Sequence, residues 1–100
     1  MTNLLKNKLV LVTGGAGFLG SQVVSYLTNY GVDPEKIIIP RSKEYDLRIW
    51  ENCVKLVTGV DIVIHLAAKV GGIGYNRNHP GELFYDNAIM GIQLIEAARL

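Results

Sequence analysis

One segment of the sequence, Leu9-Val-Leu-Val-Thr-Gly-Gly-Ala-Gly-Phe-Leu-Gly20, passes from an apolar run into a cluster of glycines and then returns to apolar residues. The run Leu9–Val12 is entirely aliphatic, which is typical of a parallel strand buried on both faces. Four glycines follow, at positions 14, 15, 17 and 20. Their spacing fits two registers, because G-x-G-x-x-G begins at Gly15 and G-x-x-G-x-x-G begins at Gly14.

A glycine turn between a strand and a helix is suited to binding phosphate. One glycine permits the tight reversal, a second lets the backbone approach a pyrophosphate, and a third lets the helix lie close to the strand. The N–H groups and the positive dipole end of the new helix then face the phosphates. The segment therefore predicts a dinucleotide-binding turn, and an incidental glycine-rich turn is the alternative.

The residues after the turn predict a βαβ unit. Apolar residues at helical spacing from Gly20 to Tyr30, followed by Gly31 as a helix-ending residue, indicate the first helix. The β-branched run Lys36–Pro40 then predicts a second strand. Tyr45–Leu47 is a candidate for a very short third strand.

Two helices and one more strand are expected in the rest of the chain. Apolar residues from Ile49 to Val57 lie at helical spacing and predict a helix that ends at Gly59. Asp61–Ala68 is nearly all apolar and predicts a central strand of the sheet. The glycine-rich segment Val70–Asn76 predicts a flexible loop at the end of that strand. Pro80 suits the first turn of a long helix over residues 81–100.

The order of these elements predicts an α/β fold. We expect a partial Rossmann-type open parallel sheet of about four strands in the order 3-2-1-4, with helices on both faces. The right-handed crossover rule places the first helix on one face and the two later helices on the other. Ligands of such sheets bind at the carboxyl ends of the strands.

The composition narrows the functional classes. With 49% hydrophobic and 19% charged residues, the 100 residues fit one soluble domain, and a net charge of +1 provides no general field for nucleic acid or an anionic membrane. Cys53 is the single cysteine, so internal disulfides are excluded and a thiolate metal site is not expected. These features and the lack of a targeting segment predict a cytoplasmic protein.

Three segments resemble the extended short-chain dehydrogenase/reductases, in the epimerase/dehydratase group that acts on nucleotide sugars. They are Val12–Gly20, the strand end His65-Leu-Ala-Ala68, and Asn87 with Gly91 on the last helix. The resemblance covers essentially the whole chain. It implies that residues 1–100 are the N-terminal part of an NAD(P)-binding domain, without the substrate domain.

Two further segments resemble one subfamily, the GDP-L-fucose synthases. These are Pro40-Arg-Ser-Lys-Glu-Tyr-Asp-Leu-Arg48 and Ala67-Ala-Lys-Val-Gly-Gly-Ile73. The subfamily uses NADPH to epimerise and reduce a GDP-4-keto-6-deoxyhexose. Another nucleotide-sugar epimerase or dehydratase remains the alternative.

The family resemblance also implies cofactor contacts. The turn Gly14, Gly15, Ala16, Gly17, Phe18, Leu19 and Gly20 would bind the pyrophosphate. Asp46 and Leu47 would flank the adenine. Leu66, Ala67 and Ala68 would line the path to the nicotinamide, with Lys69 as a neighbour of cofactor or substrate.

The family's catalytic Tyr-x-x-x-Lys pair is not found here, since no tyrosine of this chain has a lysine four positions later. We therefore assign no catalytic residue and expect the chain to be inactive alone, as part of an enzyme whose substrate is a nucleotide sugar. A non-catalytic NAD(P) sensor is the alternative.

In a complete domain a fifth strand would cover the strand Asp61–Ala68, so we also expect the isolated chain to self-associate, most simply as a symmetric homodimer.

The segment after the second strand distinguishes NADP from NAD. A carboxylate there would bond a ribose hydroxyl, whereas this chain has Arg41, Ser42 and Lys43, which suit a 2′-phosphate. NADP is therefore favoured, although NAD remains possible if Glu44 serves as the carboxylate. The alternative is that these three residues form a basic turn exposed to solvent and bind no cofactor.

Four other residues invite functional readings. His65 lies within an apolar strand, where a hydrogen-bonded core histidine is the more usual role, and Cys53 is expected to pack as a small hydrophobe. His79 could contact substrate or begin a helix. Asn87 is a polar residue among apolar neighbours on a helix, and the family resemblance implies that it makes a structural or active-site hydrogen bond.

Overall fold

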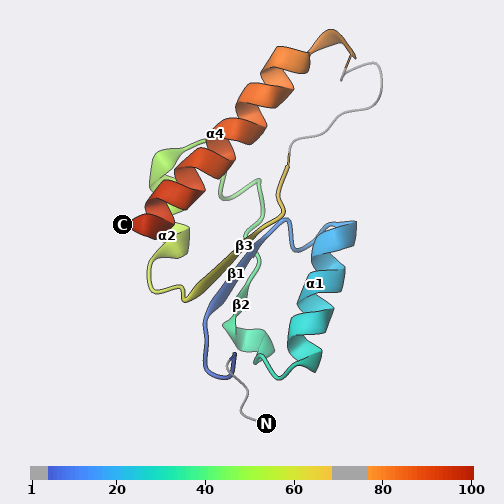
Figure 1. Ribbon diagram of the computed structural model, residues 1–100, viewed down its shortest axis with the longest axis vertical. Coiled ribbons are helices and arrows are strands. Elements are labelled where there is room, and N and C mark those ends of the chain that lie inside the picture. The colour runs from blue at the N-terminus through green and yellow to red at the C-terminus, as the bar shows by residue number, and fades with distance from the viewer. Residues whose placement is uncertain (1–4, 69–76) are drawn as a thin grey trace.

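The structure is a computed structural model that describes residues 5–68 and 77–100, and Figure 1 shows a central sheet with helices on both sides. Strands β1 (Val10–Thr13), β2 (Ile37–Ile38) and β3 (Ile62–His65) pair in parallel in the order β2-β1-β3. In this register Val10 lies opposite Ile37 of β2 and Ile62 of β3. The predicted α/β fold with an open parallel sheet is confirmed.

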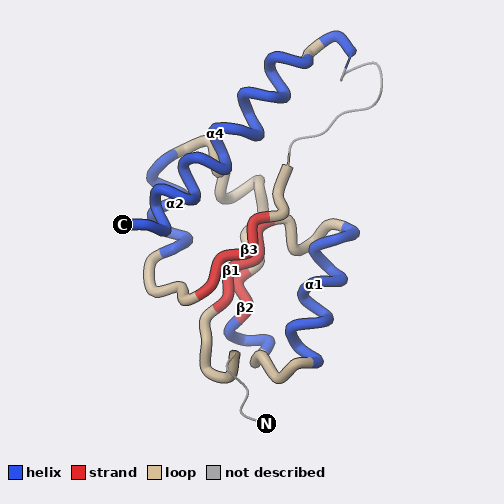
Figure 2. Tube along the Cα trace, viewed as in Figure 1, coloured by secondary structure: helices blue, strands red, loops and turns tan. Residues whose placement is uncertain are grey.

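The helices are distributed over the sheet as the crossover rule requires. Helix α1 (Phe18–Asn29) covers one face, while α2 (Trp50–Val57) and α4 (Pro80–Arg99) pack together over the other (Figure 2). A short 3-10 turn, η1 (Pro34–Lys36), leads into β2. The predicted placement of the helices is therefore confirmed.

The sheet divides the hydrophobic core because successive side chains of a strand point to opposite faces. Every residue of β1 is buried: Val10 and Val12 pack on the α1 side, whereas Leu11 packs on the side of α2 and α4. On that second side Leu11 joins a cluster with Leu47, Cys53, Leu56, Met90, Leu94 and Ala97. Strand β1 is therefore packed between two hydrophobic clusters.

The prediction of a third strand at Tyr45–Leu47 is wrong. The Asp46 carboxylate accepts a bond from the Arg48 backbone N–H at 2.9 Å, and the Asp46 carbonyl accepts from the N–H of Ile49 at 3.1 Å. These local bonds turn the backbone instead of extending it. The strand expected to be fourth is therefore β3, and the described sheet has three strands.

The other elements differ from expectation mainly at their ends. The Asp33 carboxylate accepts a bond from the N–H of Glu35 at 2.9 Å, which draws Lys36 into η1 and shortens the predicted strand Lys36–Pro40 to two residues. The predicted strand Asp61–Ala68 ends at His65. The loop expected at Val70–Asn76 lies outside the described residues.

Candidate functional site

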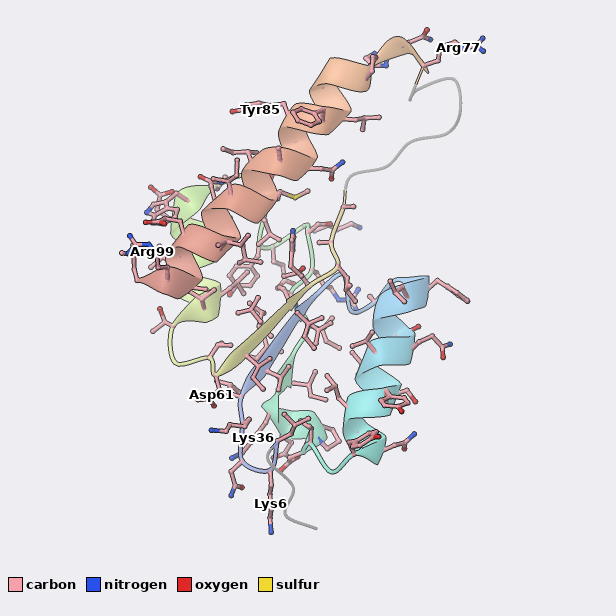
Figure 3. The ribbon with its side chains drawn as sticks, in the orientation of Figure 1. Lys6, Lys36, Asp61, Arg77, Tyr85 and Arg99 are labelled. Carbon is pink, nitrogen blue, oxygen red and sulfur yellow. The ribbon has the colours of Figure 1, made fainter. Side chains whose placement is uncertain are left out.

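A cavity of about 800 Å³ lies where the three strands end at their carboxyl edge. Its walls come from the turn between β1 and α1, the segment that follows β2, the segment that follows β3, and one residue of α4. The lining residues are Thr13, Gly14, Ala16, Gly17, Phe18, Leu19, Gly20, Pro40, Arg41, Ser42, Lys43, Tyr45, Asp46, Leu47, Arg48, Leu66, Ala67, Ala68 and Met90. Lys6, Lys36 and Asp61 lie toward the opposite, amino-terminal end of the strands (Figure 3).

The structure brings almost every predicted site residue to this one cavity. Gly15 is buried beside the side chain of Ile39 and does not line it, and Lys69 lies outside the described residues. Four lining residues absent from the prediction adjoin predicted ones in sequence, so extending each segment by one or two positions would have found them: Thr13, Pro40, Tyr45 and Arg48. Met90 also lines the cavity and belongs to α4. The helical spacing of apolar residues around it gave no indication of a binding site.

The glycines of the turn meet different steric demands. Gly14 has φ +75°, and a Cβ there would lie 2.8 Å from the backbone nitrogen of Ala67. A Cβ at Gly20 would lie 2.6 Å from the carbonyl carbon of Gly14 and nearer still to its oxygen. Gly17 is the N-cap of α1, where a Cβ would meet the Gly14 oxygen at 3.4 Å. A Cβ at Gly15 would meet the Ile39 side chain at 2.8 Å, which can shift, whereas the contacts at Gly14 and Gly20 are with backbone. The geometry therefore requires glycine most strictly at positions 14 and 20.

The N-terminus of α1 opens into the cavity. Its N-cap, Gly17, offers no side chain to bond the first N–H groups, and the first turn of α1 has no acidic residue. The first N–H groups of an α-helix have no partner within the helix, and they carry the positive end of its dipole. This end of the cavity is therefore suited to an anion.

Thr13 joins the ends of β1 and β3 through its side chain. Its hydroxyl oxygen accepts the backbone N–H groups of Leu66 at 3.0 Å and Ala67 at 3.1 Å. The same oxygen lies 2.6 Å from Nδ1 of His65. The N–H of Leu66 also bonds the main-chain carbonyl of Thr13 at 3.0 Å. Thr13 thereby holds in place two residues of the cavity wall.

The same junction surrounds the imidazole ring of His65. One hydrogen bond joins Nδ1 of His65 to the Thr13 hydroxyl, and the tautomer of the ring decides which of the two groups donates. Burial also lowers the pKa of His65 below its ordinary value. His65 is thus a half-buried, hydrogen-bonded residue of β3.

The segment after β2 supplies the cationic wall of the cavity. Arg41, Ser42 and Lys43 are exposed and line it, and the Arg41 carbonyl accepts the N–H groups of two later residues in a tight turn, Glu44 at 3.0 Å and Tyr45 at 2.9 Å. Glu44 is not among the lining residues. The positive charges of Arg41 and Lys43 on this turn therefore favour an anionic group of a ligand over a ribose hydroxyl.

The remaining candidates lie outside the cavity. Cys53 is fully buried, donates its Sγ hydrogen to the carbonyl of Leu47 at 3.2 Å, and has a thiol pKa raised by burial. His79 is the N-cap of α4, and Asn87 is half-buried on that helix.

Among the described residues, no three of His, Cys, Asp and Glu gather closely enough to hold a metal ion. Across the same ranges, no helix is long and apolar enough to span a bilayer.

Known proteins share both the sequence pattern and the fold. Residues 10–100 match the profile of the NAD dependent epimerase/dehydratase family. GDP-mannose 3,5-epimerase of Arabidopsis thaliana is 31% identical over 95% of this chain, and GDP-L-fucose synthase of Sinorhizobium fredii is 37% identical over 95% of it. The crystal structure of a GDP-L-fucose synthetase from Naegleria fowleri bound to NADP superposes with a TM-score of 0.73 at 30% identity over 97% of this chain.

The chain is shorter than these relatives. It spans 28% of the length of the Arabidopsis epimerase, 30% of the Sinorhizobium synthase and 28% of the Naegleria synthetase. The family match nevertheless extends from the start of β1 to the end of the chain and includes the glycine turn and all three described strands. The chain therefore belongs to the NAD-dependent epimerase/dehydratase family.

Proposed function

We propose that this chain is the dinucleotide-binding portion of a nucleotide-sugar epimerase or reductase, with NADP as its preferred cofactor. The observation that carries the proposal is a single cavity that combines a helix N-terminus, a cationic turn and an apolar wall. The pyrophosphate would lie on the turn Gly14–Gly20. Asp46 and Leu47 would flank the adenine, and Leu66–Ala68, with Lys69, would lead to the nicotinamide.

The preference for NADP rests on the cationic turn. Arg41 can bond a phosphate with two N–H groups, Lys43 adds a second positive charge, and Ser42 offers a hydroxyl. All three line the cavity. The Naegleria relative, at 30% identity, was crystallised bound to NADP, which supports the same choice here.

Binding measurements on the chain test this proposal. Arg41→Ala should weaken NADPH binding by about tenfold to a hundredfold, since a charged hydrogen bond contributes about 1.5–3 kcal/mol, and should leave NADH nearly unchanged. Lys6→Ala removes an equal charge at the opposite end of the strands and should change neither affinity. Equal losses of both cofactors in Arg41→Ala would show that Arg41 supports the pyrophosphate or the fold instead.

The substrate class follows from the relatives. The two curated relatives compared above are named for GDP-linked sugars, so we propose a GDP-linked hexose. A GDP-L-fucose synthase-like reaction would consume NADPH with a GDP-4-keto-6-deoxyhexose. The Arabidopsis relative favours a second candidate, epimerisation of a GDP-sugar without net consumption of cofactor. Residues 1–100 do not contain the Tyr-x-x-x-Lys pair that the family resemblance leads us to expect, so the role we propose for this chain is cofactor binding alone.

We also propose that the isolated chain self-associates. In the described sheet β3 is an edge strand whose four residues are half-buried, and exposed apolar residues cover an outer face of α4: Phe84, Tyr85, Ile92 and Ile95. Edge strands and apolar patches favour association. Sedimentation at micromolar concentration should therefore detect a dimer, whereas a monodisperse 11.0 kDa species with a cooperative melt would refute the proposal.

A further inference from the structure

Arg48 lies on the cavity wall between two carboxylates. Its Nη2 and Nε donate to the Asp46 carboxylate at 2.7 and 3.0 Å, and its Nη1 lies 3.4 Å from Oδ2 of Asp86. Both carboxylates favour the charged guanidinium and raise the pKa of Arg48 further. One cation thus links the segment before α2 to a residue of α4.

The two carboxylates differ in exposure. Asp46 lines the cavity with a partly exposed side chain, whereas Asp86 is only 5% exposed. A buried carboxylate is tolerated when it is paired and is costly when its partner is removed. The three residues together carry a net charge of about −1, which would become about −2 without Arg48.

Other contacts hold the backbone of this segment independently of the Arg48 side chain. The Leu47 carbonyl accepts bonds from Nε2 of Gln93 at 3.0 Å and from Sγ of Cys53 at 3.2 Å. The Asp46 carbonyl accepts from Nδ2 of Asn52 at 3.0 Å. Loss of the guanidinium should therefore alter the charge of the cavity wall more than the path of the chain.

The charge of this wall matters because Arg41 and Lys43 line the same cavity. In the described part of the chain, neither of their side chains makes an ion pair, whereas Arg48 is held by Asp46 and Asp86. We propose that Arg48 is a positioning residue that fixes Asp46 on the cavity wall and offsets part of the negative charge of Asp46 and Asp86, so that Arg41 and Lys43 can attract the 2′-phosphate of a nucleotide. This inference rests on the proposed dinucleotide site.

The test compares the affinities of the chain for NADPH and NADH. Arg48→Met should weaken NADPH about three- to tenfold more than NADH, since the 2′-phosphate would then meet an unbalanced carboxylate, and added salt should reduce the difference. Asp46→Asn added to Arg48→Met should restore most of the preference. Arg48→Lys keeps the charge and should keep most of it as well. Arg99→Met breaks a comparable ion pair with Glu96 outside the cavity and should change neither affinity.

Each outcome decides a separate point. Equal losses of NADPH and NADH in Arg48→Met, or no rescue by Asp46→Asn, would reduce Arg48 to a structural role and overturn the inference. If Arg48→Met fails to fold, Asp46→Asn alone decides, because removing that carboxylate should raise the preference for NADPH and an unchanged preference would contradict the proposal. If the unaltered chain binds neither cofactor, the proposed function itself fails.

Discussion

Replacing Gly20 by alanine should disrupt the turn that forms the cavity. A Cβ at this position would lie 2.6 Å from the carbonyl carbon of Gly14 and 2.7 Å from the Cα of Gly15. Both are backbone atoms, so no side chain can rotate aside and α1 must separate from the turn. Overpacking that forces side-chain and backbone shifts typically costs about 1–3 kcal/mol, and because only backbone can give way here we expect a loss of about 3 kcal/mol, out of a typical domain stability of about 5–15 kcal/mol. Urea unfolding followed by circular dichroism measures this loss.

Two other glycines provide matched controls for the same substitution. At Gly17 a Cβ would make only an ordinary contact, so alanine should cost less than about 1 kcal/mol in stability yet weaken NADPH binding by placing a methyl group on the cavity wall. At Gly81, in the first turn of α4, no atom lies within 4 Å, and alanine should stabilise the helix by about 0.5–1 kcal/mol. Wild-type stability of Gly20→Ala would refute the close packing of α1 on the turn, and unchanged NADPH affinity of Gly17→Ala would contradict the proposed pyrophosphate position.

Three further predictions concern the junction of β1 and β3 and the core behind it. Thr13→Val should lower the free energy of unfolding by about 1–3 kcal/mol, because a backbone N–H group and Nδ1 of His65 lose the hydroxyl, and Thr13→Ser should retain most of the stability in the same urea titration. The pKa of His65 lies below its ordinary value of 6.5, so the unfolded chain binds the proton more readily than the folded chain. The free energy of unfolding should therefore be at its full value above pH 6.5 and should fall as the pH drops below it. Thermal melts of His65→Asn should show a smaller dependence of stability on pH. Cys53 is buried with a raised thiol pKa, so a thiol reagent should label it only after unfolding, and rapid labelling of the folded chain would show that the core around Leu47 opens.

Local patterns were sufficient to predict the first half of the fold. The aliphatic run, the glycine spacing and the amphipathic residues that follow act within a few positions of one another, so they indicate strand, turn and helix without knowledge of distant residues. The crossover rule then assigns α1 to one face and the later helices to the other, because it depends on chirality that every chain shares. The structure confirms each of these elements.

The same reasoning failed where a local bond competes with the strand pattern. Tyr45–Leu47 alternates in the way a short strand does, yet the Asp46 side chain bonds the backbone of Arg48 and turns the chain. Leu47 is buried all the same, because α2 and α4 enclose it. The burial was therefore predictable from its hydrophobicity, whereas the conformation was not.

The sequence by itself determined the order of the elements, the parallel sheet and the segments that surround the cavity, since these follow from hydrophobic periodicity, backbone sterics and chain chirality. Only the tertiary structure decided that Gly14 lies against the backbone of Ala67, that the Thr13 hydroxyl bonds His65 of the neighbouring strand, and that Arg48 is shared between Asp46 and Asp86. Each of these depends on atoms brought together from distant parts of the chain. A pattern of neighbouring residues contains no information about such contacts until the sheet and its helices have packed.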